Sequence, residues 1–191
     1  ADEYGCKLRP HIKTHKMPLF AKMQLEAGAA GITCAKISEA EVMAEGGADD
    51  IFLAYPQVGK VKIKRAIALA QKVKRLILAV DSLECALPLN EAAKEAGICV
   101  EVRMEVDTGA KRTGVAREKA VWLAKELVKL PNLKLTGIYT FKSLVYQDEP
   151  TQDKVIAGKE EGELMERIAG DIREAGIELE DISAGSTPTG I

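Results

Sequence analysis

The chain has 191 residues, 47% of them hydrophobic and 29% charged, with a formal net charge of −2. This balance excludes a general electrostatic affinity for nucleic acid or acidic membranes, and no apolar run approaches the roughly 20 residues of a membrane span. The four cysteines lack CxxC spacing, which argues against a zinc cluster or disulfide framework. We expect a cytoplasmic domain with a substantial core and without nucleic-acid or membrane partners.

Short runs rich in Val, Ile and Leu alternate with longer segments of helical periodicity. After an opening strand around 8–15, strands are predicted at 31–36, 50–56, 76–82, 99–107, 133–141 and 181–186. Helices are predicted at 17–28, 38–46, 59–73, 83–96, 116–129 and 152–175. The strands show little alternation of polar and apolar positions, which is typical of a parallel sheet covered by helices.

Several predicted helices carry signals at their ends. Ser38 followed by Glu41 predicts a capping box, and Ser82 precedes the 83–96 helix in a similar way. Glycines expected to adopt positive φ close four helices: Gly28, Gly46, Gly97 and Gly176.

About seven parallel strands form either an open doubly wound sheet or an incomplete barrel. No GxGxxG follows the first strand, so the dinucleotide-binding alternative loses its main support. We therefore predict a (β/α)8 TIM-type barrel that is truncated, with about seven βα units present. Because the chain stops at SAGSTPTGI, where a βα loop should lead onward, we expect the last strand and any later domain to lie outside these residues.

Active sites of such barrels lie at the carboxyl ends of the strands. Polar and aromatic side chains gather at the predicted ends: Lys13, His15, Lys36, Tyr55, Asp81, Asp107, Arg112, Thr140, Phe141 and 185–187. A desolvated lysine is a nucleophile toward carbonyls, which would make Lys13 catalytic. The alternative is a strand-end lysine that simply reaches solvent.

Two loops in this set also have two interpretations. In VDTGAKRTGV, Arg112 either folds back over the barrel mouth to bind a phenolate or carboxylate, or stays solvated in a loop before a helix. SAGSTPT either directs backbone N–H groups at a phosphate or is an ordinary Ser/Thr-rich turn.

A family resemblance runs along nearly the whole chain. Four stretches carry it in the expected order: RPHIKTHK, GITCAKISEAEVMAEGGADDIFLAYPQVG, VDTGAKRTG and SAGSTPT. They closely resemble the D-threonine aldolase and D-serine dehydratase family, which are relatives of alanine racemase with pyridoxal phosphate barrels of fold type III. The resemblance implies that residues 1–191 are part of an alanine racemase N-terminal-type barrel that binds pyridoxal 5′-phosphate.

The resemblance also implies roles for the opening segment. Lys13 would hold the cofactor as a Schiff base, whereas Lys16 would be an exposed bystander. His15 would lie near the cofactor in a supporting role. By strand alternation, Arg9 and His11 share the parity of Lys13 and would line the same interior.

Other implied roles fall on the later motifs. Arg112 would bind the phenolic oxygen of the cofactor. Thr140 and Phe141 end the strand whose ring packs on the pyridine face, and here that ring would be Phe141. The phosphate cradle would consist of Gly185, Ser186 and Thr187.

The chain departs from the family pattern in two respects. The family usually continues with a Tyr and then a Gly-His pair, where this chain has Phe141, Ser143 and Leu144. A stacking role survives the change to Phe, but a hydrogen bond from a phenol or imidazole does not. The metal ligands of the family lie in a C-terminal β domain absent from this chain, so we expect no metal site here and a divalent metal only in a longer enzyme.

The implied function is a pyridoxal phosphate-dependent lyase for D-β-hydroxy amino acids. Two outcomes use the same residues: retro-aldol cleavage to glycine and an aldehyde, or loss of the hydroxyl to give a 2-oxo acid and ammonia. An amino-acid racemase and a non-catalytic pyridoxal phosphate homeostasis protein remain open as alternatives. The expected partners are a small D-amino acid and, in the intact protein, a second copy in a homodimer.

Overall fold

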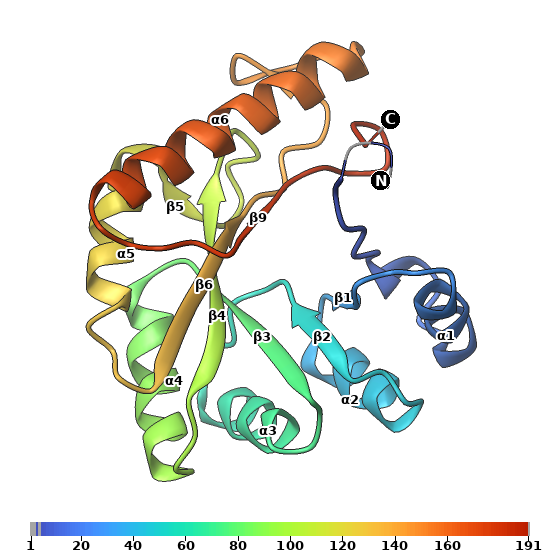
Figure 1. The fold of residues 1–191 in the computed structure, drawn as a ribbon, viewed down its shortest axis with the longest axis vertical. Coiled ribbons are helices and arrows are strands. Elements are labelled where there is room, and N and C mark those ends of the chain that lie inside the picture. Colours follow the sequence, from blue (N-terminus) through green and yellow to red (C-terminus); the bar gives the residue numbers. More distant parts are fainter. Residues whose placement is uncertain (1–2, 4, 191) are drawn as a thin grey trace.

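A curled sheet of parallel strands, wrapped by helices, forms the centre of the molecule (Figure 1). The computed structural model describes residue 3 and residues 5–190. The order across the sheet is β1 (Ile32–Cys34), β2 (Asp50–Leu53), β3 (Arg75–Val80), β4 (Val100–Asp107), β6 (Leu133–Tyr139) and β9 (Asp181–Ser183), with β5 (Val115–Ala116) beside β4. The TIM-type prediction is confirmed as a curled, open part of such a barrel.

The main core lies between the sheet and the helices on its outer side. These helices are α1 (Pro18–Glu26), α2 (Ile37–Glu45), α3 (Lys60–Ala70), α4 (Leu83–Glu95), α5 (Ala120–Leu127) and α6 (Lys154–Glu174). Leu78, Val102 and Ile138 are fully buried beneath them, and each such side chain contributes about 1.5–3 kcal/mol. A smaller cluster of Phe52, Ile77, Ala79 and Tyr139 fills the inside of the curl.

The later strands and the helices match their predicted positions, but one helix start was wrong. Helix α2 begins at Ile37 with Lys36 as its N-cap, so Ser38 lies inside the helix. The carboxylate of Glu39 accepts the Ala35 N–H at 2.9 Å. A side chain from the first turn therefore satisfies a donor ahead of the helix, and no Ser38–Glu41 capping box forms. Ser82 is an N-cap as predicted, although it makes no side-chain capping bond.

Gly28, Gly97 and Gly176 have positive φ as predicted, whereas Gly46 does not. Gly46 has φ −78°, and the left-handed residue is Gly47 at 95°. Gly46 is small for another reason, because an added Cβ would lie 2.5 Å from the Cβ of Pro18. It therefore allows α1 to pack closely on the end of α2.

The opening strand was also a wrong prediction. The segment makes one isolated bridge, His11 to Thr33, and then forms the 3₁₀ helix η2 (Ile12–Thr14). Pro10 has no N–H to donate to a ladder. The Nδ1 of His11 accepts the Lys13 N–H at 3.2 Å, and the Nδ1 of His15 accepts the Met17 N–H at 3.1 Å. These side-chain bonds turn the chain where a strand would continue.

The inside of the curl near the amino ends of the strands holds what we call the floor network. Its members are Arg9, Asp50, Arg75, Glu101, Arg103 and Asp181. Arg9 contacts Asp50 at 2.7 Å, at the end of the curl opposite to Lys13. Arg103, 4% exposed, pairs with Asp181 and lies 5.2 Å from the centre of the Phe52 ring. Burial lowers the pKa of Arg103, and Asp181 opposes that shift.

A short hairpin between β6 and α6 escaped prediction. Strands β7 (Val145–Tyr146) and β8 (Glu149–Pro150) pair antiparallel. Gln147 and Asp148, the residues between them, have φ 49° and 63°. Such two-residue turns usually contain glycine, so the sequence carries no hairpin signal here. The 3₁₀ helix η3 (Arg117–Lys119) precedes α5.

Candidate active site

Lys13, Arg112 and Phe141 meet at the carboxyl ends of the strands. The Nζ of Lys13 lies 5.3 Å from the centre of the Phe141 ring, and the Cζ of Arg112 lies 5.1 Å from it. The three residues come from η2, the loop after β4 and the end of β6. Two cations on one ring create a strongly electropositive spot, which suits an anionic ligand.

The structure separates the two lysines of the opening segment. The Nζ of Lys16 lies 3.2 Å from the carboxylate of Glu39. That carboxylate also accepts the Ala35 N–H. Within the described residues Lys13 forms no ion pair, and its side chain is exposed. Of these two amines, that of Lys13 is therefore the one left without an ion pair at the mouth of the curl.

Both histidines near Lys13 have one ring nitrogen committed to the backbone. Because the Nδ1 atoms of His11 and His15 accept N–H groups, each neutral ring carries its proton on Nε2. Burial, followed by the charge of Lys13, lowers the pKa of His11 to about 4. The Nε2 of His15 is buried and has no hydrogen-bond partner in the described residues, and its ring meets Phe20 edge-on at 5.6 Å.

The loop that carries Arg112, residues 108–114, is held at its start by Asp107. The Oδ1 of Asp107 accepts the N–H groups of Gly109 and Lys111 at 2.9 and 3.0 Å. At the far end an added Cβ on Gly114 would lie 2.6 Å from the backbone N of Asp107. This close return fixes the path of the Arg112 loop.

Glu105, a residue that our sequence analysis did not assign, lies inside the curl below the Arg112 loop. Its carboxylate accepts the hydroxyls of Thr113 and Tyr139, each at 2.8 Å. Glu105 is 4% exposed, and burial raises its pKa. The sequence did hold a signal, since charged residues alternate with apolar ones at 101, 103, 105 and 107, which places Glu105 on the polar face of the strand.

The hydroxyl of Thr140 is engaged away from Phe141. It bonds to the Val106 carbonyl at 2.8 Å and to the Thr108 hydroxyl at 2.7 Å, and the side chain is buried. Thr140 therefore joins the ends of neighbouring strands, and its hydroxyl is not presented beside Lys13 and Arg112.

The expected phosphate turn is joined to α6. The N–H of Gly185, at φ 103°, donates to Glu161 Oε2 at 3.1 Å, and the Ser186 N–H donates to Thr189 Oγ1 at 2.9 Å. Glu161 also accepts the Lys142 N–H at 2.9 Å. It thus links this turn to the segment after Phe141. Its position on the buried face of α6 was the available signal.

Comparison with known proteins gives the family. The profile described as "Alanine racemase, N-terminal domain" matches residues 1–191. The chain belongs to the alanine racemase N-terminal domain family.

The names of several relatives specify activities on D-hydroxy amino acids. The chain is 31% identical to a D-threonine aldolase of Arthrobacter sp. over 98% of its length and 49% of that protein. It is 32% identical to a D-threo-3-hydroxyaspartate dehydratase of Delftia sp. (strain HT23) over 100% of the chain and 50% of that protein. The crystal structure of a D-threonine aldolase from Filomicrobium marinum superposes with a TM-score of 0.89 at 28% identity, over 98% of this chain and 51% of that one. The chain spans about half the length of these relatives.

The departure from the family pattern after β6 has a structural counterpart. Ser143, which stands where the family usually has Gly, has φ 62°, a conformation that favours glycine. The preceding Lys142 is 1% exposed and pairs with Glu160 on α6. Ser143 therefore adopts a left-handed backbone conformation although it carries a side chain.

Pyridoxal phosphate, the cofactor that the family uses, is matched by the donor set at the mouth. The aldehyde group of the cofactor can form a Schiff base with an amine such as that of Lys13. Its anionic phenolate and phosphate oxygens bind to cations and N–H donors. Arg112 provides a guanidinium, His15 a buried Nε2–H that has no partner among the described residues, and Phe141 an apolar ring. These groups fit the cofactor, with the phosphate turn less open than expected because Glu161 and Thr189 already occupy two of its N–H groups.

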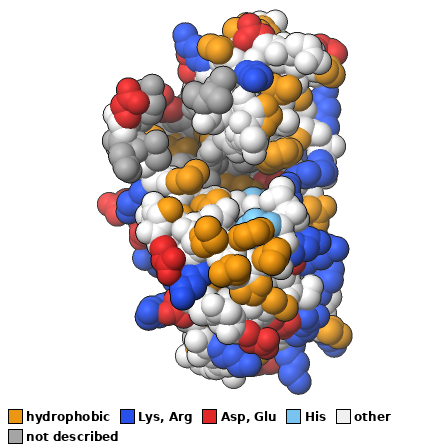
Figure 2. Space-filling view, turned by 90° about the vertical axis from the view of Figure 1, so that its right-hand side faces the viewer, with side chains coloured by type: hydrophobic (Ala, Val, Ile, Leu, Met, Phe, Trp, Pro, Cys, Tyr) orange, Lys and Arg blue, Asp and Glu red, His pale blue; other side chains and the backbone are white. Residues whose placement is uncertain are grey.

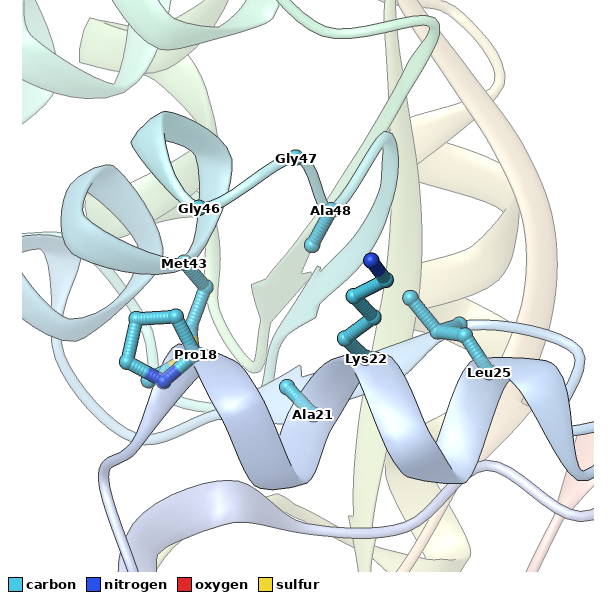
Figure 3. A pocket seen from close by; sticks show the side chains of 8 residues that line it. All are labelled: Pro18, Ala21, Lys22, Leu25, Met43, Gly46, Gly47 and Ala48. Carbon is cyan, nitrogen blue, oxygen red and sulfur yellow. The ribbon is translucent and has the colours of Figure 1, made fainter.

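A partly open hollow of about 250 Å³ lies away from the mouth, between α1 and the end of α2. It is lined mainly by apolar and backbone atoms of Pro18, Ala21, Lys22, Leu25, Met43 and 46–48 (Figure 3). The described residues contain no group of three or more His, Cys, Asp or Glu placed to hold a metal. In the same residues no helix is long and apolar enough to cross a membrane.

One face beside the mouth is apolar. Met17, Leu19, Phe20 and Met23 follow one another along the start of α1 and are all more than 40% exposed. Figure 2 shows hydrophobic side chains gathered around a histidine on this face of the molecule. We call this set the α1 patch.

Proposed function

We propose that the protein is a pyridoxal phosphate-dependent lyase that acts on D-β-hydroxy amino acids. The observation that carries this proposal is the convergence of Lys13 and Arg112 on Phe141 at the strand ends. Its support from comparison is the family membership together with the named activities of relatives about 30% identical.

Lys13, Arg112 and Phe141 have distinct tasks in this proposal. When bound, pyridoxal phosphate supplies an electron-poor ring that takes up the electron pair released when a bond at Cα of an amino acid breaks. The Nζ of Lys13 would hold the cofactor covalently and, once displaced by the substrate amine, accept a proton. The guanidinium of Arg112 would donate hydrogen bonds to an anionic oxygen. Phe141 would exclude water from one side of the site.

Three further groups would complete the site. Ser186 and Thr187, with the Gly185 turn, would bind the phosphate, and the tie from Gly185 to Glu161 would keep that turn in place. The Nε2–H of His15 would donate to a ligand, since it has no partner in the described residues.

The first test is the colour of the protein. We expect the native full chain to show the visible absorbance band of lysine-bound pyridoxal phosphate. A protein that stays colourless after addition of the cofactor would overturn the proposal.

The second test identifies the reaction. The protein is incubated with D-threonine, D-serine, D-3-hydroxyaspartate and D-alanine, with and without a divalent metal. We expect glycine with an aldehyde, or a 2-oxo acid with ammonia, in amounts that increase with the metal. Formation of the L-enantiomer without cleavage would assign a racemase instead, and cofactor binding without any turnover would assign a homeostasis protein.

We further propose that the intact protein works in the cytoplasm as a homodimer. The α1 patch supports the homodimer, because exposed apolar side chains in one contiguous row usually contact another surface. Sedimentation velocity tests it, and a purely monomeric protein at micromolar concentration would contradict it.

A further inference from the structure

Glu105 is a buried carboxylate to which the proposed reaction gives no task. It lies on β4, and its two hydrogen bonds join elements that are far apart in the chain. Tyr139 at the end of β6 donates from inside the curl, and Thr113 donates from the Arg112 loop. A buried carboxylate needs such donors, since leaving it unsatisfied carries a large free-energy penalty.

We propose that Glu105 is a positioning residue that holds Arg112 in place through the hydroxyl of Thr113. The inference rests on the proposed function, because its readout is the binding of pyridoxal phosphate. Glu105 itself lies below the mouth and need not touch the cofactor.

The covalent structure of the loop supports this assignment. Thr113 directly follows Arg112, so fixing the Thr113 side chain restricts the backbone from which the guanidinium projects. Gly114 returns against the backbone of Asp107 and donates to Asp81 Oδ2 at 3.4 Å. The Lys111–Asp107 bond anchors the residue directly before Arg112, and the Thr113–Glu105 bond anchors the residue directly after it.

The charges around Glu105 are arranged consistently with that task. Asp81 at the end of β3 and Arg112 in the loop are the charged groups that act on it, and Tyr139 faces it from β6. Asp81 opposes its ionisation, whereas Arg112 and the two hydroxyls favour it. An ionised Glu105 would attract Arg112 toward the interior, and the Cζ of Arg112 lies 5.1 Å from the centre of the Phe141 ring.

The main test removes one hydroxyl without changing any charge. Thr113→Val should weaken pyridoxal phosphate binding to the native full chain about tenfold, measured by equilibrium dialysis and by the visible absorbance band. Thr113→Ser restores the hydroxyl and should stay within about twofold of wild type. The matched control is Thr136→Val, a buried threonine on β6 whose hydroxyl donates to the Val102 carbonyl, and it should also stay within about twofold.

A double-mutant cycle separates positioning from general stability. In an Arg112→Ala background Thr113→Val should change cofactor affinity by less than about twofold, because the residue being positioned is gone. Thr113→Val should likewise add little to Glu105→Gln, which retains the shape of the side chain but can accept only one of the two hydroxyls.

The outcomes distinguish this inference from the proposed function. If wild type binds the cofactor and Thr113→Val matches wild type, or costs as much in the Arg112→Ala background as alone, the positioning role is refuted. If wild type takes up no cofactor, the proposed function fails and this inference fails with it.

Discussion

The two ends of the curled sheet differ in whether their charged side chains form ion pairs. In the floor network arginines face carboxylates, as where Arg75 contacts Glu101 at 2.7 Å. At the mouth, Lys13 and Arg112 instead face the ring of Phe141, and neither forms an ion pair within the described residues. Paired charges inside the curl stabilise the fold, whereas unpaired cations at strand ends are available to an anionic ligand. This difference in charge pairing identifies the mouth as the candidate functional site, independently of any cavity.

The largest effect should come from the mouth. Lys13→Ala should abolish the visible absorbance of covalently bound pyridoxal phosphate, because no other amine is placed on Phe141 in the described residues. Lys16→Ala is the matched control and should keep the full band, since Lys16 pairs with Glu39 instead. A coloured Lys13→Ala protein would break the contrast between the two lysines.

Substitutions in the floor network should lower the free energy of unfolding. Asp181→Ala leaves Arg103, 4% exposed, without its carboxylate, and should lower the free energy of unfolding by about 3 kcal/mol. The neighbouring Glu180 pairs with the exposed Lys134, so Glu180→Ala should cost less than about 1 kcal/mol. Urea denaturation measures both, and equal losses would show that burial of the pair is unimportant.

Phe141 should contribute to cofactor affinity more than to folding. Phe141→Leu removes the ring that both cations contact, and should weaken pyridoxal phosphate binding about fivefold. Leu87→Ala changes an exposed apolar side chain on α4, away from the mouth, and serves as the control. Fluorescence titration measures both, and similar affinities for the two variants would argue against stacking at Phe141.

The smallest effect concerns pH. The pKa of His11 is about 4 in the folded chain and 6.5 ordinarily, so the unfolded state binds more protons between these values. Stability should therefore fall as pH decreases through this window, by about 1 kcal/mol from pH 7 to pH 5 once solvent screening of the half-buried ring is allowed for. His11→Gln should flatten that dependence in urea midpoints at the two pH values.

Periodicity predicted most of the fold, because the later strands and the helices follow their apolar patterns closely. The predicted opening strand was wrong because the side chains of His11 and His15 accept backbone N–H groups and turn the chain. Such hydrogen bonds leave no periodic signal in the sequence. The predicted Ser38–Glu41 capping box is absent because the helix begins one residue earlier and the Glu39 carboxylate accepts the Ala35 N–H ahead of it.

The candidate site was predictable only in part. Lys13, Arg112 and Phe141 come together as the motifs implied, but the supporting residues do not stand next to them in the sequence. Glu105 accepts a hydrogen bond from Tyr139, which lies 34 residues later in the sequence. Glu161 accepts one from Gly185, which lies 24 residues later. Such partners become visible only once the strands are placed side by side.

The placement of the histidines offers a spectroscopic use. The chain contains only two, His11 and His15, and they flank Lys13. Both have the Nε2–H form imposed by backbone donors. An imidazole nitrogen NMR spectrum of this chain would therefore report on one segment alone, and would register the arrival of a ligand at Lys13 without any introduced label beyond isotopes.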